Sequence, residues 1–219
     1  MDYEKFFVSL SRQIPHISRI VLFGSRARGD FNEKSDFDIA IYGGLNFQDK
    51  LLIRDKIEEW HFVYKVDLVF MNELTDDEMR SNIEKDGIVI VNKVQQKTAN
   101  YANALKRLNE ALSVEPADDI VLDAIIQRFE FTVELAWKTM RAVLLDEGVA
   151  QDELMSPKQV VRSAFQADLI SAGEVWFAML EARNITSHVY DLAQAEKIVD
   201  EIRATFITEL EKLEKKLEK

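Results

Sequence analysis

The chain of 219 residues has no cysteine and only three histidines. Without thiols it can form no disulfide, thiol nucleophile or zinc-thiolate site, and three scattered histidines exclude a histidine-rich metal cage. It also has no run of 18 apolar residues, and its first residues carry acids where a secretion signal would carry bases. We therefore expect no membrane span and no secretion signal, and a folded cytoplasmic protein.

An excess of positive charge is missing as well. The formal net charge is -11, which argues against broad electrostatic binding of nucleic acid, because such binding depends on clustered Lys and Arg side chains. The first hundred residues hold 17 acidic and 14 basic residues, and the remainder hold 22 and 14. Most of the net negative charge therefore lies in the second half of the chain. The overall negative charge is compatible with a local basic site.

The residues that are present divide the chain into two parts with different periodicity. Short runs rich in Ile and Val predict strands at 17–23, 36–42, 65–70 and 87–91. Amphipathic segments between them predict helices at 2–13, 47–60 and 75–86. From about residue 101 the spacing of apolar residues predicts helices alone, including one long helix over 117–148. We predict an α+β domain with a mixed sheet at 1–95, followed by an all-α helical bundle at 96–219.

Cap residues suggest several helix boundaries. Thr75 and Glu78 have the spacing of a capping box, and Ser156 with Pro157 has the order expected at a helix start. Gly148 follows the long helix, where a C-cap is expected. The polar stretch 92–100 lacks a periodic apolar face and is predicted to be the junction between the two parts.

The segment GSRARG, from Gly24 to Gly29, comes directly after an apolar strand. Amides freed by a glycine turn, the Ser25 hydroxyl and nearby guanidinium groups can bind phosphate oxygens. The segment fits neither the GxGxxG nor the GxxxxGK[ST] motif, so alone it is a weak indication. Arg26 and Arg28 are supporting candidates only, because exposed arginines are more often plain surface residues.

Two aspartates follow at positions i and i+2 of a predicted strand. Asp36 and Asp38 share one face of that strand, and Phe37 points to the other. Asp67 interrupts another apolar strand, where a charge is costly unless it faces a site. If the two strands are neighbours, three carboxylates converge, and Mg²⁺ with a nucleotide triphosphate would suit them. The alternative is that Asp36 caps a turn and that Asp38 and Asp67 simply face water on an edge strand. For the three aspartates together at this spacing, we favour the metal site.

The run GSRARGDFNEKSDFDIAI resembles the signature of the minimal nucleotidyltransferases (MNT) of the DNA polymerase β-like superfamily, with a GS turn, a D-x-D pair and a later acid. The resemblance covers about the first 95 residues. It implies that Gly24 and Ser25 hold the triphosphate of ATP and that Asp36 and Asp38 bind Mg²⁺. Asp67 would be the third carboxylate, serving a metal ion or the attacking hydroxyl. The implied reaction transfers a nucleoside monophosphate and releases pyrophosphate.

The second part contains one histidine, His188, in the segment ARNITSHVYD. Arg183 precedes it by five positions; an arginine offers fixed charge to a phosphate, and a histidine can move a proton near neutral pH. Together they could cleave RNA through attack of its 2′-hydroxyl, without a metal. Two residues five positions apart do not lie on one face of a helix. Either the long Arg183 side chain must therefore extend to the face of His188, or a second subunit must complete the site. The alternative is an ordinary surface histidine near a helix end.

The pattern R-x4-H followed by x-Y resembles the motif of HEPN domains, and roughly residues 100–215 are similar to the HEPN proteins called nucleotidyltransferase substrate-binding proteins. The resemblance implies a bundle that dimerises, with Arg183 and His188 as a composite ribonuclease pair and Asn184 as a polar support. Tyr190 would be the hydroxyl that an MNT partner modifies with AMP to silence the ribonuclease.

Toxin and antitoxin of this kind generally occupy two chains, whereas here both would occupy one. Tethering raises the effective concentration of the partner domain, so modification could occur within a chain or across a dimer. The leading interpretation is therefore a self-contained toxin-antitoxin protein. Two alternatives stay open: a nucleotidyltransferase that acts on a small molecule with the bundle as a substrate-binding module, and a bundle that serves as a scaffold without ribonuclease activity.

Overall fold

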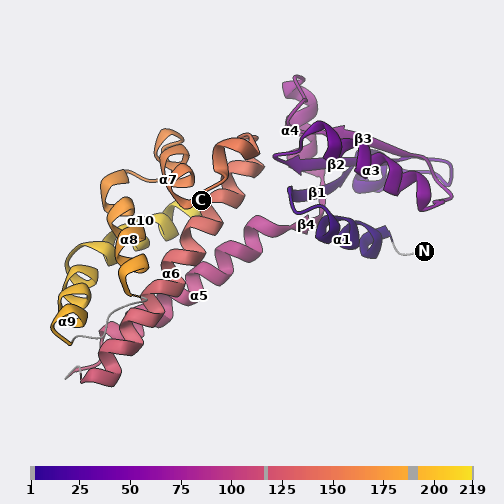
Figure 1. The fold of residues 1–219 in the computed structure, drawn as a ribbon. Helices are drawn as coiled ribbons and strands as arrows, with labels where there is room; N and C mark the ends of the chain where they lie inside the picture. Colours follow the sequence, from indigo (N-terminus) through magenta and orange to yellow (C-terminus); the bar gives the residue numbers. More distant parts are fainter. Residues whose placement is uncertain (1–2, 116–117, 187–191, 219) are drawn as a thin grey trace. The chain divides into compact units, whose positions relative to one another are not determined.

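The computed structural model describes residues 3–115, 118–186 and 192–218, which form two compact units (Figure 1). The first comprises Met1–Val94 with Ala142–Asp152, and the second comprises Gln95–Arg141 with Glu153–Lys219. The division is therefore not a single cut in the sequence, because the end of one long helix groups with the first unit. No helix of the described residues is long and apolar enough to cross a membrane.

The first unit contains a four-stranded sheet with helices. Its elements are α1 (Tyr3–Gln13), β1 (Ile17–Phe23), α2 (Gly24–Arg28), β2 (Phe37–Gly43), α3 (Phe47–Glu59), β3 (Val66–Phe70), α4 (Asp77–Asp86) and β4 (Ile88–Asn92). The strand order is β3-β2-β1-β4; β1 pairs antiparallel with β2 and β4, and β2 pairs parallel with β3. This is the mixed sheet with helices that the sequence predicts, and the prediction is confirmed.

The two faces of this sheet are covered by different helices, because successive side chains of a strand point to opposite sides. On one face, Ile20 and Ile39 pack with buried residues of α1 and α3. On the other face, Val21 and Ala40 pack with Ile83 of α4. By the same alternation Phe37 lies in the first of these cores, and Asp38 belongs to the face that α4 covers.

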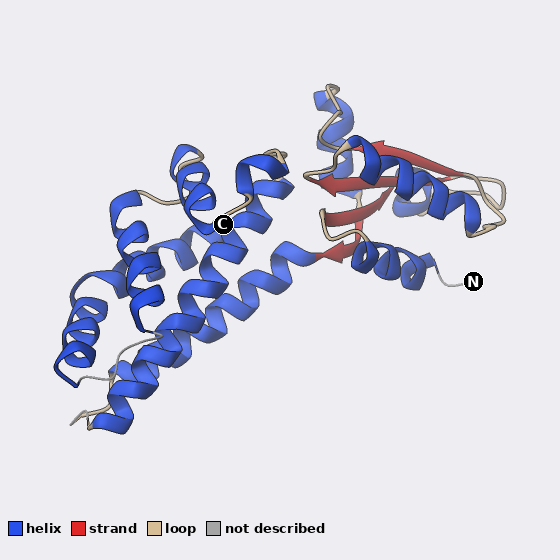
Figure 2. Cartoon of the chain, in the orientation of Figure 1, coloured by secondary structure: helices blue, strands red, loops and turns tan. Residues whose placement is uncertain are grey.

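The second unit is helical, as predicted. Its helices are α5 (Lys93–Leu112), α6 (Asp119–Asp146), α7 (Pro157–Gln166), α8 (Gly173–Thr186), α9 (Leu192–Glu201) and α10 (Ile207–Leu217), with a short π-helix at Ile202–Phe206 between the last two. Figure 2 draws the described strands only in the first unit. Phe129 and Phe206 stack in the bundle core with ring centroids 5.5 Å apart, and the buried Tyr101 hydroxyl donates a hydrogen bond to the Leu210 carbonyl (2.7 Å).

The helix boundaries agree with the sequence in part. Ser156 accepts from the Gln159 amide and Pro157 is the first residue of α7, and Gly148 takes the left-handed φ of +92° after α6. At α4, however, the cap is Asp76, which accepts from the Met79 amide. Thr75 is not the cap, because an aspartate one position later offers a stronger acceptor.

The polar stretch 92–100 is not a loop. Helix α5 begins at Lys93, immediately after β4, and continues without a break to Leu112. Lys, Gln and Ala are good helix formers, and Tyr101 and Leu105 anchor the following turns in the bundle core. The helix therefore extends through a stretch with little apolar surface of its own.

Candidate active site

Gly24 directly follows β1, is the first residue of α2, and begins the turn that borders the site. Its φ of +70° is left-handed, and a Cβ atom at this position would overlap the Asp38 carboxylate, lying 2.9 Å from its Cγ. The five-residue helix α2 follows and is closed by Gly29, whose amide donates to the Ser25 carbonyl (3.0 Å). Only glycine at position 24 lets the Asp38 side chain lie against this turn.

Asp38 of β2 and Asp67 of β3 are brought together by the parallel pairing of these strands, whereas Asp36 lies directly before β2 and not within it. Asp38 is directly opposite Asp67 in the register, and Asp36 precedes Asp38 by two residues. The sequence left the neighbourhood of the two strands open as a condition for convergence, and the structure meets this condition. Burial raises the pKa of Asp38 above its usual value, and the negative charges of Asp67 and Asp36 raise it further. This repulsion favours binding of a cation.

The positive charges of Arg28 and Lys65 both act on Asp38, and the cation that contacts these carboxylates is Lys65. Its Nζ lies 2.6 Å from Asp67 Oδ1 and 3.9 Å from Asp36 Oδ2, and the hydrogen bond with Asp67 raises the pKa of Lys65. Within 3–115, 118–186 and 192–218, no three acidic or histidine side chains are arranged as a ready metal cluster. The donor set nevertheless fits Mg²⁺ in type, since it consists of carboxylate oxygens from Asp38 of β2, Asp67 of β3 and Asp36 directly before β2.

Arg26 faces away from the carboxylates and organises the loop that carries Asp36. Its Nε and Nη2 donate to the Ser35 carbonyl (3.1 and 2.7 Å), and its Nε also donates to the Asp36 carbonyl (3.2 Å). The guanidinium lies over the rings of Phe37 (4.0 Å) and Tyr64 (4.4 Å). The geometry thus makes Arg26 a positioning residue of the loop.

We predict that Arg26→Ala destabilises the protein, because two backbone carbonyls lose a charged donor and three rings, those of Phe31, Phe37 and Tyr64, lose a cation. The expected loss is about 1–3 kcal/mol of unfolding free energy. Chemical denaturation measures it, and Arg28→Ala is the matched comparison, since the exposed Arg28 pairs only loosely with Asp30 (3.3 Å). That variant should stay within about 0.5 kcal/mol of the wild type; equal losses in the two variants would contradict the assignment.

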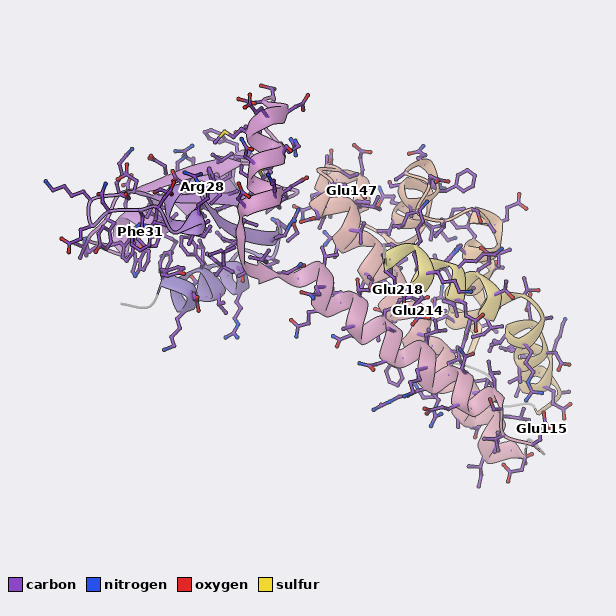
Figure 3. All side chains as sticks on the ribbon, turned by 180° about the vertical axis from the view of Figure 1, so that it is seen from behind. Arg28, Phe31, Glu115, Glu147, Glu214 and Glu218 are labelled. Carbon is purple, nitrogen blue, oxygen red and sulfur yellow. The ribbon has the colours of Figure 1, made fainter. Side chains whose placement is uncertain are left out.

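A cavity of about 500 Å³ lies beside the glycine turn. It is lined by Phe23, Gly24 and Arg28 and by the α4 side, with Asp76, Glu78, Met79, Asn82 and Asp86. Figure 3 labels Arg28 and Phe31, which lie in the first unit near this turn. The cavity has the size of a small-molecule site. Three of its lining side chains are acidic, and Asp36, Asp38 and Asp67 are not among the lining residues.

In the second unit Arg183 lies near the end of α8 and forms an ion pair with Glu134 of α6. Arg183 Nη2 donates to Glu134 Oε2 (2.6 Å), and Arg183 Nη1 donates to Asn184 Oδ1 (3.1 Å). Lys138 Nζ and the Trp137 indole also bond to Glu134, at 2.7 and 2.9 Å. Burial opposes ionisation of Glu134, yet these hydrogen bonds and charges outweigh it and lower the pKa of its carboxyl.

His188 and Tyr190 lie outside the described residues, so their roles stay predictions. The structure brings Arg183 and Asn184 together, and separately it brings together Gly24 and the three aspartates. Sequence reasoning left Lys65 without a role and missed Glu134. The role of Lys65 was indicated by its position, because it precedes Asp67 by two residues and so shares its face of the strand. No spacing rule indicated Glu134, which lies 49 residues before Arg183.

The comparisons with known proteins agree with this two-part arrangement. The chain belongs to the family described as nucleotidyltransferase substrate binding protein like, whose model matches residues 96–219. The model described as polymerase beta, nucleotidyltransferase matches residues 7–96. The chain therefore combines a nucleotidyltransferase domain of the polymerase β type with a HEPN-like substrate-binding domain.

Three particular proteins are similar to parts of the chain. A Haemophilus influenzae protein, provisionally named ribonuclease HepT, is 34% identical over 86 residues, which cover 38% of this chain and 59% of that protein. A Methanocaldococcus jannaschii protein, provisionally named a protein adenylyltransferase, is 58% identical over 31 residues, 14% of this chain and 31% of that protein. A solved structure from Haemophilus influenzae, described as a substrate binding domain of a nucleotidyltransferase, has 26% identity and a TM-score of 0.50 and covers 56% of this chain and 99% of that one.

Proposed function

We propose that residues 1–95 form an Mg²⁺- and ATP-dependent nucleotidyltransferase domain that transfers AMP to Tyr190 of a HEPN ribonuclease domain formed by residues 96–219. The transfer neutralises the ribonuclease, so the chain is a toxin-antitoxin pair in one polypeptide. The observation that carries the proposal is the placement of Asp38 against Gly24 and opposite Asp67. The names of two relatives, a ribonuclease and a protein adenylyltransferase, support it.

In this proposal each residue of the first unit has a chemical task. Gly24 and Ser25 hold the triphosphate beside the cavity, and the three aspartates hold Mg²⁺, which when bound offsets phosphate charge. The Tyr190 hydroxyl oxygen forms a bond to the α-phosphorus of ATP, and the bond from that phosphorus to its bridging oxygen breaks. Pyrophosphate leaves, and the hydroxyl proton passes through Asp67 to water.

In the second unit Arg183 would neutralise the phosphate that is attacked by the RNA 2′-hydroxyl, and His188 would move the proton. Glu134 fixes the direction of the Arg183 guanidinium, and Asn184 supports it. We further propose that two bundles dimerise to complete this site, because the spacing of Arg183 and His188 does not suit one helix face. Modification of Tyr190 can then occur within a chain or across the dimer.

The proposal predicts a mass change in the intact protein. Wild-type chain incubated with ATP and Mg²⁺ should gain the mass of one or more AMP groups on Tyr190, unless it is already modified as purified. Mass spectrometry of the intact protein before and after incubation measures the gain, and peptide mapping locates it. Asp38→Ala should show no gain in either sample; an unmodified wild type that gains nothing would refute the proposed transfer.

A second candidate function follows from the family description of a substrate-binding protein and from the related solved structure of a substrate binding domain. The first unit could transfer a nucleotide to a small molecule that the bundle binds. The Tyr190→Phe variant separates the two candidates. An AMP-modified small molecule formed at the wild-type rate by this variant would favour the second candidate, whereas loss of all transfer would favour Tyr190 as the acceptor.

A further inference from the structure

A backbone hydrogen bond of Lys65 and the ring contacts of the preceding residue position Lys65 beside the carboxylates. Its carbonyl accepts the Phe37 amide (2.8 Å), which ties its backbone to the start of β2. The preceding residue, Tyr64, packs on Phe37 with ring centroids 5.6 Å apart and lies beneath the Arg26 guanidinium. Because Tyr64 is anchored on the opposite side of the sheet, the Lys65 side chain emerges on the side of Asp67.

The ammonium group uses the oxygens that a divalent cation would need. Lys65 Nζ contacts Asp67 Oδ1 at 2.6 Å and is 3.9 Å from Asp36 Oδ2, so one lysine lies between the carboxylate of β3 and that of the residue directly before β2. A divalent cation held by the same groups would sit close to the ammonium, and like charges at such a distance repel. Lysine and metal therefore compete for Asp67.

We propose that Lys65 is a built-in counter-cation that occupies the carboxylate site until a divalent cation displaces it from Asp67. This inference rests on the proposed function only in taking a divalent cation as the ligand of Asp36, Asp38 and Asp67. The lysine neutralises part of the repulsion among these aspartates when no metal is bound. Because the metal must displace the Lys65 ammonium group from Asp67, the protein binds the metal more weakly than the same carboxylates would without Lys65.

Binding of Mn²⁺ in the absence of nucleotide tests this competition. The full-length protein is first stripped of metal with a chelator, and free Mn²⁺ is then followed by electron paramagnetic resonance during titration. Lys65→Met removes the ammonium and keeps much of the side-chain length, and it should fold because Lys65 is 66% exposed. We expect Lys65→Met to bind Mn²⁺ about two- to fivefold more tightly than the wild type, the size of effect of one partly exposed charge.

Three further variants make the result specific. Lys34→Met removes another exposed lysine, in the loop before Asp36, and should leave the Mn²⁺ affinity unchanged. Lys65→Arg keeps the charge and should bind Mn²⁺ no more tightly than the wild type. Asp38→Asn in the Lys65→Met background should abolish the tight binding, which shows that the ion binds at this site.

The inference is overturned if Lys65→Met binds Mn²⁺ no better than the wild type, including the case in which neither protein binds it. It is overturned as well if Lys34→Met tightens binding to the same degree, because the effect would then be one of net charge. Neither outcome depends on transfer of AMP. A wild type that gains AMP while Lys65→Met shows no tighter Mn²⁺ binding would leave the proposed function standing and refute only the role of Lys65.

Discussion

Replacing Gly24 by alanine is expected to abolish AMP transfer, whereas the same replacement at Gly29 is expected to leave it largely intact. Both glycines have left-handed φ values, +70° and +83°, so either alanine adds backbone strain of about 1–2 kcal/mol. Only at Gly24 does the added Cβ overlap the Asp38 carboxylate; at Gly29 nothing lies within 4 Å of it. The two variants therefore share the strain and differ in the displacement of Asp38.

Two measurements on the pair separate stability from function. Chemical denaturation should give similar losses of unfolding free energy for the two variants, because the strain is similar. The initial rate of AMP incorporation should fall by at least about a hundredfold in Gly24→Ala alone, since a displacement of about 1 Å at a reacting centre has this effect. A Gly24→Ala protein with the wild-type rate, or a Gly29→Ala protein that is equally impaired, would show that the approach of Asp38 to the turn is not required.

The parts of this fold that could be predicted from sequence are those with a simple period. Alternation in DFDIAIY and KVDLVF placed Asp38 and Asp67 on strands, as the structure has them; that these strands are neighbours is a finding of the structure. The long helix α6 and the cap at Ser156 followed from spacing and from capping chemistry. Local rules work there because a period or a cap is decided by a few successive residues.

The features that sequence reasoning did not predict depend on partners far apart in the chain. Lys65 could be placed on the face of Asp67, but its role as the cation beside two strands required their register. Glu134 supports Arg183 across 49 positions, and this contact depends on how α6 and α8 pack. The helical start of α5 was hidden because its first turns lack an apolar stripe, although their residues favour helix.

A chain that keeps its ribonuclease domain and loses its transferase is expected to arrest growth of the cells that express it. Asp38→Ala should leave Tyr190 unmodified, so that the HEPN site is active, whereas the wild type should be tolerated at the same protein level. Growth curves and the integrity of total RNA after induction measure the effect. Growth without RNA cleavage in the Asp38→Ala strain would favour a bundle that is only a scaffold.

A second substitution in the Asp38→Ala background tests whether the Arg183 site causes this toxicity. Arg183→Ala should restore growth and slow RNA cleavage by about a hundred- to a thousandfold, as expected when a charge is removed from a reacting phosphate. Arg203→Ala is the matched control, because Arg203 is also an arginine paired with a glutamate, Glu115 (3.1 Å), and the two arginine side chains are 37% and 35% exposed. It should remain toxic. Rescue by both substitutions would point to a general loss of folding, whereas rescue by Arg183→Ala alone ties the toxicity to the guanidinium that Glu134 holds.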